Sequence, residues 1–476
     1  MTIQNRGVPS DDPPYAATMP DNETIFSWVK DLTVFTGRGT QTVDDHRSAD
    51  YLLDTFRTFG LADVQQQETE SLHWRATRSQ LIIGATPISH SPVVFSLDTG
   101  NGPFSTGPDG LIAPIVDVGD GQEDDFARAD VNGKIVLFNL RFILSRSLLL
   151  AAGEFFYDPH DSVDPADLDT ANPYLNNYDD VLERAIAAGA AGFVGVLADY
   201  FDSHDIRPEY TPGITIPGLW VTKAAGARIR ALTASGAGTA TLRLEGERAP
   251  TPARTVIGYL PGRSSDTIMI QSHHDSAWDG GVEDASGTAE VLALARYYSQ
   301  IPQQQRPKTL MFVLMDSHWT GYQAHAKFVD TFITAPATPR RIVANVTLEH
   351  IAKQAEIGPN GQLRVYDRPE YRGIFENVSP PLKTAIENAV TTHGLQRTLR
   401  LPTDKLFPLI GELPTDADHV YQAGIPTISF ISGPIYLYDK ADTLDKVYKP
   451  DLAPVAHAFA DIIDQLAATP SDKIRS

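Results

Sequence analysis

A chain of 476 residues is too long for one ordinary hydrophobic core, so its length predicts two or three domains. Its 42% hydrophobic and 21% charged residues are typical of a folded globular protein, and its net charge of -21 argues against nucleic-acid and anionic-membrane partners. The absence of cysteine excludes disulfides and thiolate ligands, so any metal must be held by His, Asp or Glu.

The N-terminal residues MTIQNRGVPSDDPPY contain no apolar signal core, and no run reaches the roughly 18 apolar residues of a membrane span. We therefore expect a cytoplasmic protein, although a mature protein whose signal has been removed would show the same pattern. The expected partner is a small-molecule or peptide-like substrate, with no nucleic acid and no membrane, and the sequence leaves a homo-oligomer open. Residues 1–20 carry four prolines and several acids, which favours a flexible N-terminal arm.

A helix is predicted soon after the arm. Ala49, Leu52, Leu53 and Phe56 recur at helical spacing, and Gly60 follows them as the expected C-cap. We assign residues 21–94 to the first part of a domain that resumes at residue 248.

Residues 95–247 differ from the flanking sequence in their residue pattern, with short apolar runs separated by Gly, Asp and Pro. This pattern predicts an inserted, β-rich domain. Its strands are expected in NGKIVLFNL, GFVGVL and IPGLWV, and its helices in RAIAAG and KAAGARIRALTASG. Residues 142–181 form a long insertion within it, apolar at first and then acidic. Such insertions are often lids or binding loops, and a surface excursion packed by its own side chains is an equal alternative.

From residue 248 to 470, buried strands alternate with helices. Strands are predicted at 255–260, 267–271, 309–315, 341–348 and 426–431, and helices at 288–298 and 316–329. This order predicts an α/β fold, with a mixed and mostly parallel sheet flanked by helices. The polar clusters HHDSAWDGGVED, DSHWTGYQAH, EHIAKQAE, PTDADHV and YLYDKADTLD follow these strands. Because sites in such sheets lie at the carboxyl ends of strands, the clusters predict a functional site.

The order and spacing of these clusters resemble those of the zinc aminopeptidases related to glutamate carboxypeptidase, glutaminyl cyclase and the transferrin receptor. The resemblance covers nearly the whole chain, and residues 95–247 are similar to the protease-associated domain that many members carry. In that family a strand ends in His-x-Asp, and a metal-bridging Asp lies four residues before the Gly of a Ser-Gly pair. A Glu-Glu pair, a later carboxylate and a final His complete the two-metal site.

The resemblance implies one complete set of metal ligands. His273 and Asp275 match His-x-Asp, which implies that His273 binds metal and that Asp275 orients it. The bridging acid falls on Glu283, four residues before Gly287, and the later carboxylate falls on Glu349. The implied cofactor is one divalent ion bound by His273, Glu283 and Glu349, with zinc expected first and iron or manganese as alternatives.

The second metal of the family loses its ligands in this chain. The Glu-Glu pair falls on His318 and Trp319, and the final His falls on Tyr438. Neither Trp nor Tyr is a usual ligand of a divalent ion. His318 becomes the expected general base, with an additional ligand or a histidine that merely fills space as alternatives.

Three further aromatic or imidazole side chains receive weaker interpretations. Tyr438 is expected to donate to a developing oxyanion, and a tyrosine satisfied by the backbone is an equal alternative. His274 and His350 are expected outside the set of metal ligands, because neighbouring side chains on a strand point to opposite faces.

The leading functional prediction is hydrolysis of a peptide-like amide bond, or of an ester, by a single-metal variant of an aminopeptidase site. One alternative is a lyase, hydratase or cyclase that acts on a small molecule. The other is a non-catalytic binding protein on a decayed peptidase scaffold, which predicts that no metal is bound.

Overall fold

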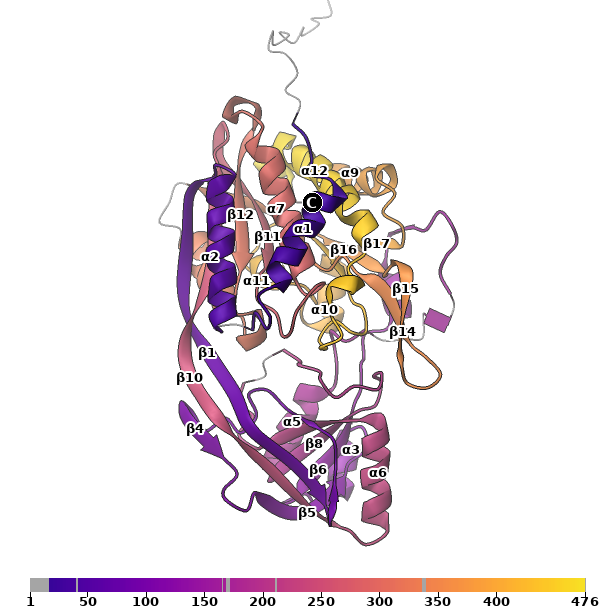
Figure 1. The fold of residues 1–476 in the computed structure, drawn as a ribbon. Helices are drawn as coiled ribbons and strands as arrows, with labels where there is room; N and C mark the ends of the chain where they lie inside the picture. Colours follow the sequence, from indigo (N-terminus) through magenta and orange to yellow (C-terminus); the bar gives the residue numbers. More distant parts are fainter. Residues whose placement is uncertain are drawn as a thin grey trace, which may run out of the picture.

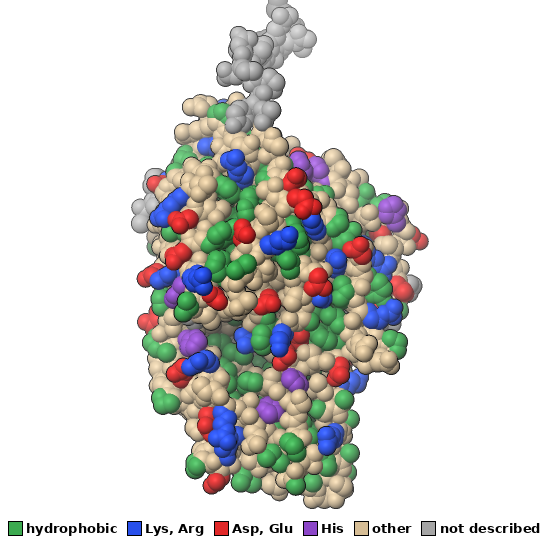
Figure 2. Space-filling view, in the orientation of Figure 1, with side chains coloured by type: hydrophobic (Ala, Val, Ile, Leu, Met, Phe, Trp, Pro, Cys, Tyr) green, Lys and Arg blue, Asp and Glu red, His purple; other side chains and the backbone are tan. Residues whose placement is uncertain are grey.

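The computed structural model describes residues 17–39, 42–164, 166–167, 172–209, 212–335 and 340–475. It has a larger lobe and a smaller lobe, stacked end to end (Figure 1). Side chains of both charges are interspersed over the face in Figure 2. Most of the predicted N-terminal arm, residues 1–16, lies outside the described residues. No helix in the described ranges is long and apolar enough to cross a bilayer.

The sheet of the larger lobe is mixed, with parallel strands at its centre. Its strands lie in the order β10 (Thr239–Leu260), β12 (Lys308–Met315), β11 (Ser264–His273), β13 (Arg341–Leu348), β18 (Thr427–Ser432), β16 (Arg372–Glu376), β17 (Thr398–Pro402) and β7 (Phe155–Tyr157). The pairs β12–β11, β11–β13 and β13–β18 are parallel. Every residue of β12 is buried, as expected of a central strand covered on both faces.

Helices pack against this sheet. They are α1 (Asn22–Thr33), α2 (Val43–Thr58), α7 (Ala285–Ser299), α8 (Gln323–Val329), α9 (Pro380–Thr392), α10 (Thr403–Ile410), α11 (Asp418–Gln422) and α12 (Leu452–Ala468). The helix predicted from apolar spacing is α2, which buries Ala49, Leu52 and Phe56. The helix predicted at 288–298 lies within α7. A separate hairpin is formed by β14 (Lys353–Ile357) and β15 (Leu363–Pro369).

The strands of the smaller lobe are mostly parallel. Their order is β9 (Gly218–Thr222), β8 (Gly192–Leu197), β6 (Ile135–Leu140) and β5 (Leu111–Asp117), with β3 (Ser91–Pro92) antiparallel at the edge of β9. Three helices accompany it: α3 (Glu123–Arg128), α5 (Tyr178–Ala187) and α6 (Lys223–Ala234). Apart from β3, these elements lie within residues 95–247, for which the inserted domain stays a prediction from sequence.

A long two-stranded ribbon joins the lobes. Strand β1 (Ala62–Ile83) pairs antiparallel with β10 over nearly its whole length, and the ribbon runs through both lobes in Figure 1. One half of β10 pairs with β5 and β4 (Gly102–Ser105), and the other half pairs with β12. The boundary placed at 247/248 from sequence therefore lies inside β10, and both lobes belong to one hydrogen-bonded sheet.

The insertion at 142–181 leaves the smaller lobe and packs on the larger one. It contains α4 (Arg146–Ala152) and β7, and β7 pairs with β17 of the larger lobe. Arg146 Nη2 lies 2.8 Å from Glu370 Oε1, and both side chains are buried. The described part of the insertion thus packs against the larger lobe, where β7 adds an edge strand beside β17.

The helix predicted over residues 316–329 is broken, which corrects the sequence interpretation. A single 3-10 turn spans His318–Thr320, and α8 begins only at Gln323. Ser317, Gly321 and Tyr322 all have left-handed backbone angles, with φ of 66°, 105° and 60°. A right-handed helix cannot continue through such residues, so the segment bends around His318.

Arg38 stabilises the loop between β11 and α7 through hydrogen bonds to its backbone. Its guanidinium is fully buried and donates to the carbonyl oxygens of Leu32, His274, Asp279 and Gly280, each at 2.9 Å. Hydrogen bonds from a charged donor contribute about 1.5–3 kcal/mol each when their loss leaves buried groups unpaired.

We expect Arg38→Met to lower the free energy of unfolding by at least about 3 kcal/mol, measured by urea denaturation. Arg47→Met is the control, because the Arg47 side chain is 65% exposed and its contacts with Asp44 and the Phe35 ring lie at the surface. It should change stability by less than about 0.5 kcal/mol. Equal effects of the two substitutions would contradict the role assigned to Arg38.

Candidate metal centre and catalytic pocket

Three neighbouring parallel strands deliver the histidines of the site. Strand β11 ends at His273, β12 is followed by the turn that carries His318, and β13 is followed directly by Glu349 and His350. Because these strands are adjacent and parallel, their carboxyl ends meet at one edge of the sheet.

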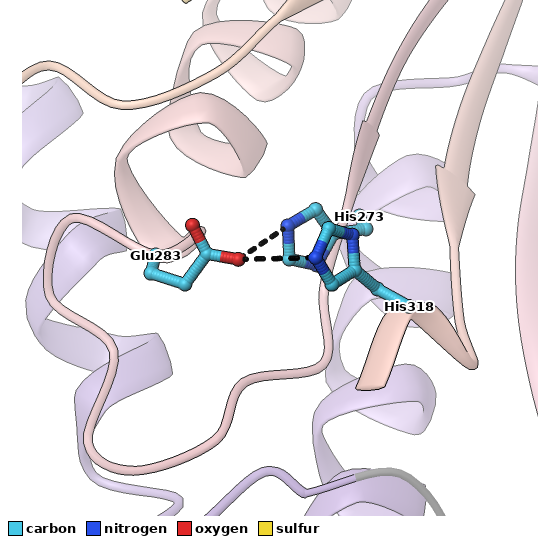
Figure 3. A group of neighbouring side chains, drawn as sticks. All are labelled: His273, Glu283 and His318. Carbon is cyan, nitrogen blue, oxygen red and sulfur yellow. Dashed lines mark ion pairs between the residues drawn. The ribbon is translucent and has the colours of Figure 1, made fainter. Parts of the chain in front are cut away.

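Glu283 lies at the centre of this group. Its Oε1 is 3.1 Å from His273 Nε2 and 3.7 Å from His318 Nε2 (Figure 3), and its Oε2 contacts His350 Nε2. All four residues are buried. Beyond these contacts with one another, neither oxygen of Glu283, nor Nε2 of His273 or His350, has a hydrogen-bond partner among the described residues. Buried polar atoms without such partners are rare, and this donor set fits a bound cation.

The opposite ring nitrogen of each histidine faces an oxygen acceptor. The Nδ1 atoms of His273, His318 and His350 lie 2.9 Å from Asp275 O, 2.8 Å from Asp416 Oδ1 and 2.9 Å from Ser432 O, respectively. Asp275 Oδ1 is also 3.3 Å from His273 Nδ1. A ring that donates from Nδ1 turns Nε2 toward the centre as the remaining ligand atom.

Charge stabilises positive groups at this centre. Burial alone would lower the pKa of His273, but the carboxylates of Asp416 and Glu283 outweigh burial and raise it. Burial would raise the pKa of Glu283, but His350 and His273 outweigh it and hold that pKa below its usual range. The buried acids therefore favour a cation, either protons on the imidazoles or a metal ion.

Glu349 has a different environment from Glu283. Its carboxylate accepts the backbone N–H of Asp416 at 3.3 Å and the Ser429 hydroxyl at 3.5 Å. Burial and the charge of Asp416 raise its pKa well above the ordinary value. Within the described residues, the sets of three ligand atoms closer than 4.8 Å are His273–Glu283–His318, His273–Asp284–His350 and Asp45–His274–Asp316, none of which includes Glu349.

Asp284 is occupied by hydrogen bonds. Its Oδ1 accepts from the backbone N–H groups of Gly287 at 2.9 Å and His350 at 3.2 Å, and its Oδ2 accepts the Ser272 hydroxyl. Asp284 is the N-cap of α7, so its carboxylate has a structural role that Glu283 lacks.

Tyr438 and Trp319 pack together beside the centre. Their rings are edge to face, with centroids 5.2 Å apart, and both side chains are buried. The Tyr438 hydroxyl donates to Glu209 Oε1 at 2.8 Å. Its hydrogen-bond partner is therefore a side chain of the smaller lobe and not the backbone.

Glu209 is a pocket residue that sequence reasoning missed. It lies between β8 and β9 of the smaller lobe, accepts a second hydrogen bond from Tyr322 at 2.8 Å, and has Oε1 3.6 Å from His318 Nε2. No motif surrounds it, and only the folded chain brings it to the centre. The shared pocket is lined by Tyr174, Glu209, Glu283, His318, Tyr322, Glu349, His350, Glu412, Asp416, Asp418, His419 and Tyr438, among others.

The part of the chain that carries this centre matches a known peptidase family. Residues 255–469 match the sequence profile of peptidase family M28. This region is a peptidase family M28 domain. It carries all the centre's histidines and Glu283, whereas Glu209 lies outside it. No curated protein sequence matches the chain significantly.

Solved structures similar to the whole chain share its fold. A zinc aminopeptidase from Bacillus subtilis is 18% identical with a TM-score of 0.65, covering 96% of this chain and 99% of its own. A peptidase M28 precursor from Shewanella amazonensis SB2B is 18% identical with a TM-score of 0.66, covering 95% and 94%. An aminopeptidase from Aneurinibacillus sp. strain AM-1 is 19% identical with a TM-score of 0.60, covering 96% and 94%. The predicted fold, a mostly parallel mixed sheet flanked by helices, is confirmed.

Proposed function

We propose that the M28 domain hydrolyses peptide-like amide bonds and uses one divalent ion, zinc in the first place. The observation that carries this proposal is the convergence of buried His273 and His318 nitrogens on Glu283, whose oxygens have no hydrogen-bond partner among the described residues. The match to a peptidase family supports the hydrolytic reaction. The loss of two family ligands at Trp319 and Tyr438 supports a single ion.

The residues available to hold the ion are His273 and Glu283, with Glu349 as the third ligand implied by the family resemblance. A divalent ion there supplies Lewis-acid chemistry, polarising the scissile carbonyl and making water more acidic. Asp275 holds His273 in one orientation through Nδ1.

His318 is the residue placed to move protons. Asp416 accepts from its Nδ1 at 2.8 Å and fixes the ring, so Nε2 faces the pocket. In the proposed reaction, Nε2 takes a proton from the attacking water and later gives it to the leaving amine. The Tyr438 hydroxyl assists a developing oxyanion if the substrate oxygen displaces Glu209 as its acceptor.

We expect the purified protein to contain close to one divalent ion per chain, measured by elemental analysis. Dialysis against a chelator should abolish hydrolysis of a panel of aminoacyl and peptide substrates, and one equivalent of zinc should restore it. Bound metal without any amide hydrolysis would favour a lyase, hydratase or cyclase instead. Absence of both metal and activity would favour a binding protein on this scaffold.

A further inference from the structure

We propose that His350 is a metal ligand, and that the ion is held by His273, His350 and Glu283 while His318 stays free for proton transfer. This assignment replaces Glu349, the third ligand implied by resemblance, with its neighbour in sequence. It rests on the proposed function only in requiring that the centre binds a divalent ion.

The backbone turns His350 into the centre. Strand β13 ends at Leu348, and His350 adopts a left-handed conformation with φ of 57°. Its backbone N–H donates to Asp284 Oδ1 at 3.2 Å, which anchors the turn. The alternation of side chains that holds within a strand therefore ends before His350, and its ring reaches Glu283.

The ring of His350 has the hydrogen bonding typical of a metal-bound imidazole. Its Nδ1 lies 2.9 Å from both the Ser432 carbonyl oxygen and the Tyr174 hydroxyl, and that hydroxyl itself donates to the carbonyl oxygen. A carbonyl oxygen can only accept, so Nδ1 carries the proton and Nε2 of the neutral ring presents a lone pair. His273 repeats the pattern, because its Nδ1 faces Asp275 O at 2.9 Å.

These lone pairs point at a carboxylate. Nε2 of His350 and of His273 contact different oxygens of Glu283, and beyond these contacts none of the four atoms has a hydrogen bond to a described residue. A lone pair facing a carboxylate oxygen is repulsive unless a proton or a metal ion lies between them. The ligand atoms of His273 and Glu283 lie within 4.8 Å of each other, as do those of His273 and His350, so one divalent ion would be within reach of all three side chains.

The neighbouring acids have other partners. The Glu349 carboxylate accepts from Asp416 N–H and the Ser429 hydroxyl, and Asp284 accepts from two backbone N–H groups and a hydroxyl. Glu283 is the acid of this group that has no such donor among the described residues.

His318 stacks on His273, with ring centroids 4.2 Å apart, but it also has partners outside the proposed ligand set. Its Nε2 is 3.7 Å from Glu283, and it also faces Glu209 at 3.6 Å and the Tyr322 hydroxyl at 3.5 Å, on the side of the pocket. Two histidines and one glutamate form a known ligand set of catalytic zinc, which leaves a coordination position open for water or substrate.

The test compares zinc affinities of the metal-free full-length protein, measured by competition with a chromophoric chelator. His350→Ala should weaken zinc binding by more than about 100-fold, the upper end of the loss seen for residues that only support a ligand. Glu349→Gln should weaken it by less than about tenfold, and so should His325→Ala, a buried histidine that does not contact Glu283. Cobalt-substituted protein should show an altered visible spectrum in His350→Ala and an unaltered one in Glu349→Gln.

The outcomes separate this assignment from the proposed function. Metal binding by the parent protein with unchanged affinity in His350→Ala overturns only the assignment of His350. A loss above 100-fold in Glu349→Gln likewise overturns it, and this result stands even if His350→Ala does not fold. A parent protein that binds no divalent ion overturns both proposals. Near-UV circular dichroism of each metal-free variant verifies its fold.

Discussion

Glu283→Ala is expected to abolish stoichiometric metal binding and to lower kcat/KM by more than about 100-fold. Glu283 is the carboxylate on which the three imidazoles converge, and it is buried without another hydrogen-bond partner in the described chain. Its removal takes away a ligand and also the negative charge that stabilises a cation there. Elemental analysis and steady-state kinetics on the best peptide substrate measure the two effects.

Two variants make the Glu283 experiment specific. Glu283→Asp keeps the charge but shortens the side chain by one methylene, so we expect metal binding between that of the parent and of Glu283→Ala. Glu290→Gln is the matched control. Like Glu283, Glu290 is a buried glutamate whose oxygens have no hydrogen-bond partner in the described residues. It lies on α7, and among those residues no histidine forms an ion pair with it. It should leave metal content unchanged. Full activity and full metal content in Glu283→Ala would rule out the proposed centre.

His318→Ala is expected to lower kcat by about 10²–10⁴-fold while the protein keeps its metal. The ring is fixed by Asp416 at Nδ1, and its Nε2 faces the pocket, which is the arrangement of a group that transfers protons. Removing it should leave substrate binding largely intact, so KM should change much less than kcat.

The control for His318 is His325→Asn. His325 contacts the other oxygen of Asp416, with Nε2 3.5 Å from Oδ2, but makes no ion pair with Glu283. We expect less than about tenfold loss of kcat, since supporting groups usually contribute less than the group that transfers the proton. Loss of metal in His318→Ala would instead make His318 a ligand, the alternative reading of the same geometry.

The fold could be predicted from sequence because strand and helix periodicities are local. The apolar runs at 255–260, 309–315 and 341–348 became β10, β12 and β13, each buried within the sheet. The polar clusters after these strands predict a site at the carboxyl ends of the sheet, and the family resemblance implies that His273, Glu283 and His318 take part in it. His273 and His318 reach the centre because β11 and β12 end there, whereas Glu283 reaches it from the loop before α7.

The rest of the site depends on features that a single sequence does not display. The alternation rule puts the His350 ring on the face opposite Glu349, but the left-handed backbone of His350, which no glycine marks in the sequence, brings the ring into contact with Glu283. The helix breaks around His318 because the backbones of Ser317 and Tyr322 are also left-handed. Glu209 reaches the pocket through tertiary packing alone, from a lobe whose own sequence has no site-like pattern.

The ribbon of β1 and β10 makes the two lobes a single folding unit. A truncated protein that begins at residue 248 would lack β1 and would cut β10, since the two strands pair from Gln65 opposite Ile257 to Ile83 opposite Ala240. The remaining part of β10 would expose unpaired backbone groups, which are a template for aggregation. We therefore expect the M28 domain to be recovered in soluble form only together with β1 and the smaller lobe, whose Glu209 would otherwise be absent from the pocket.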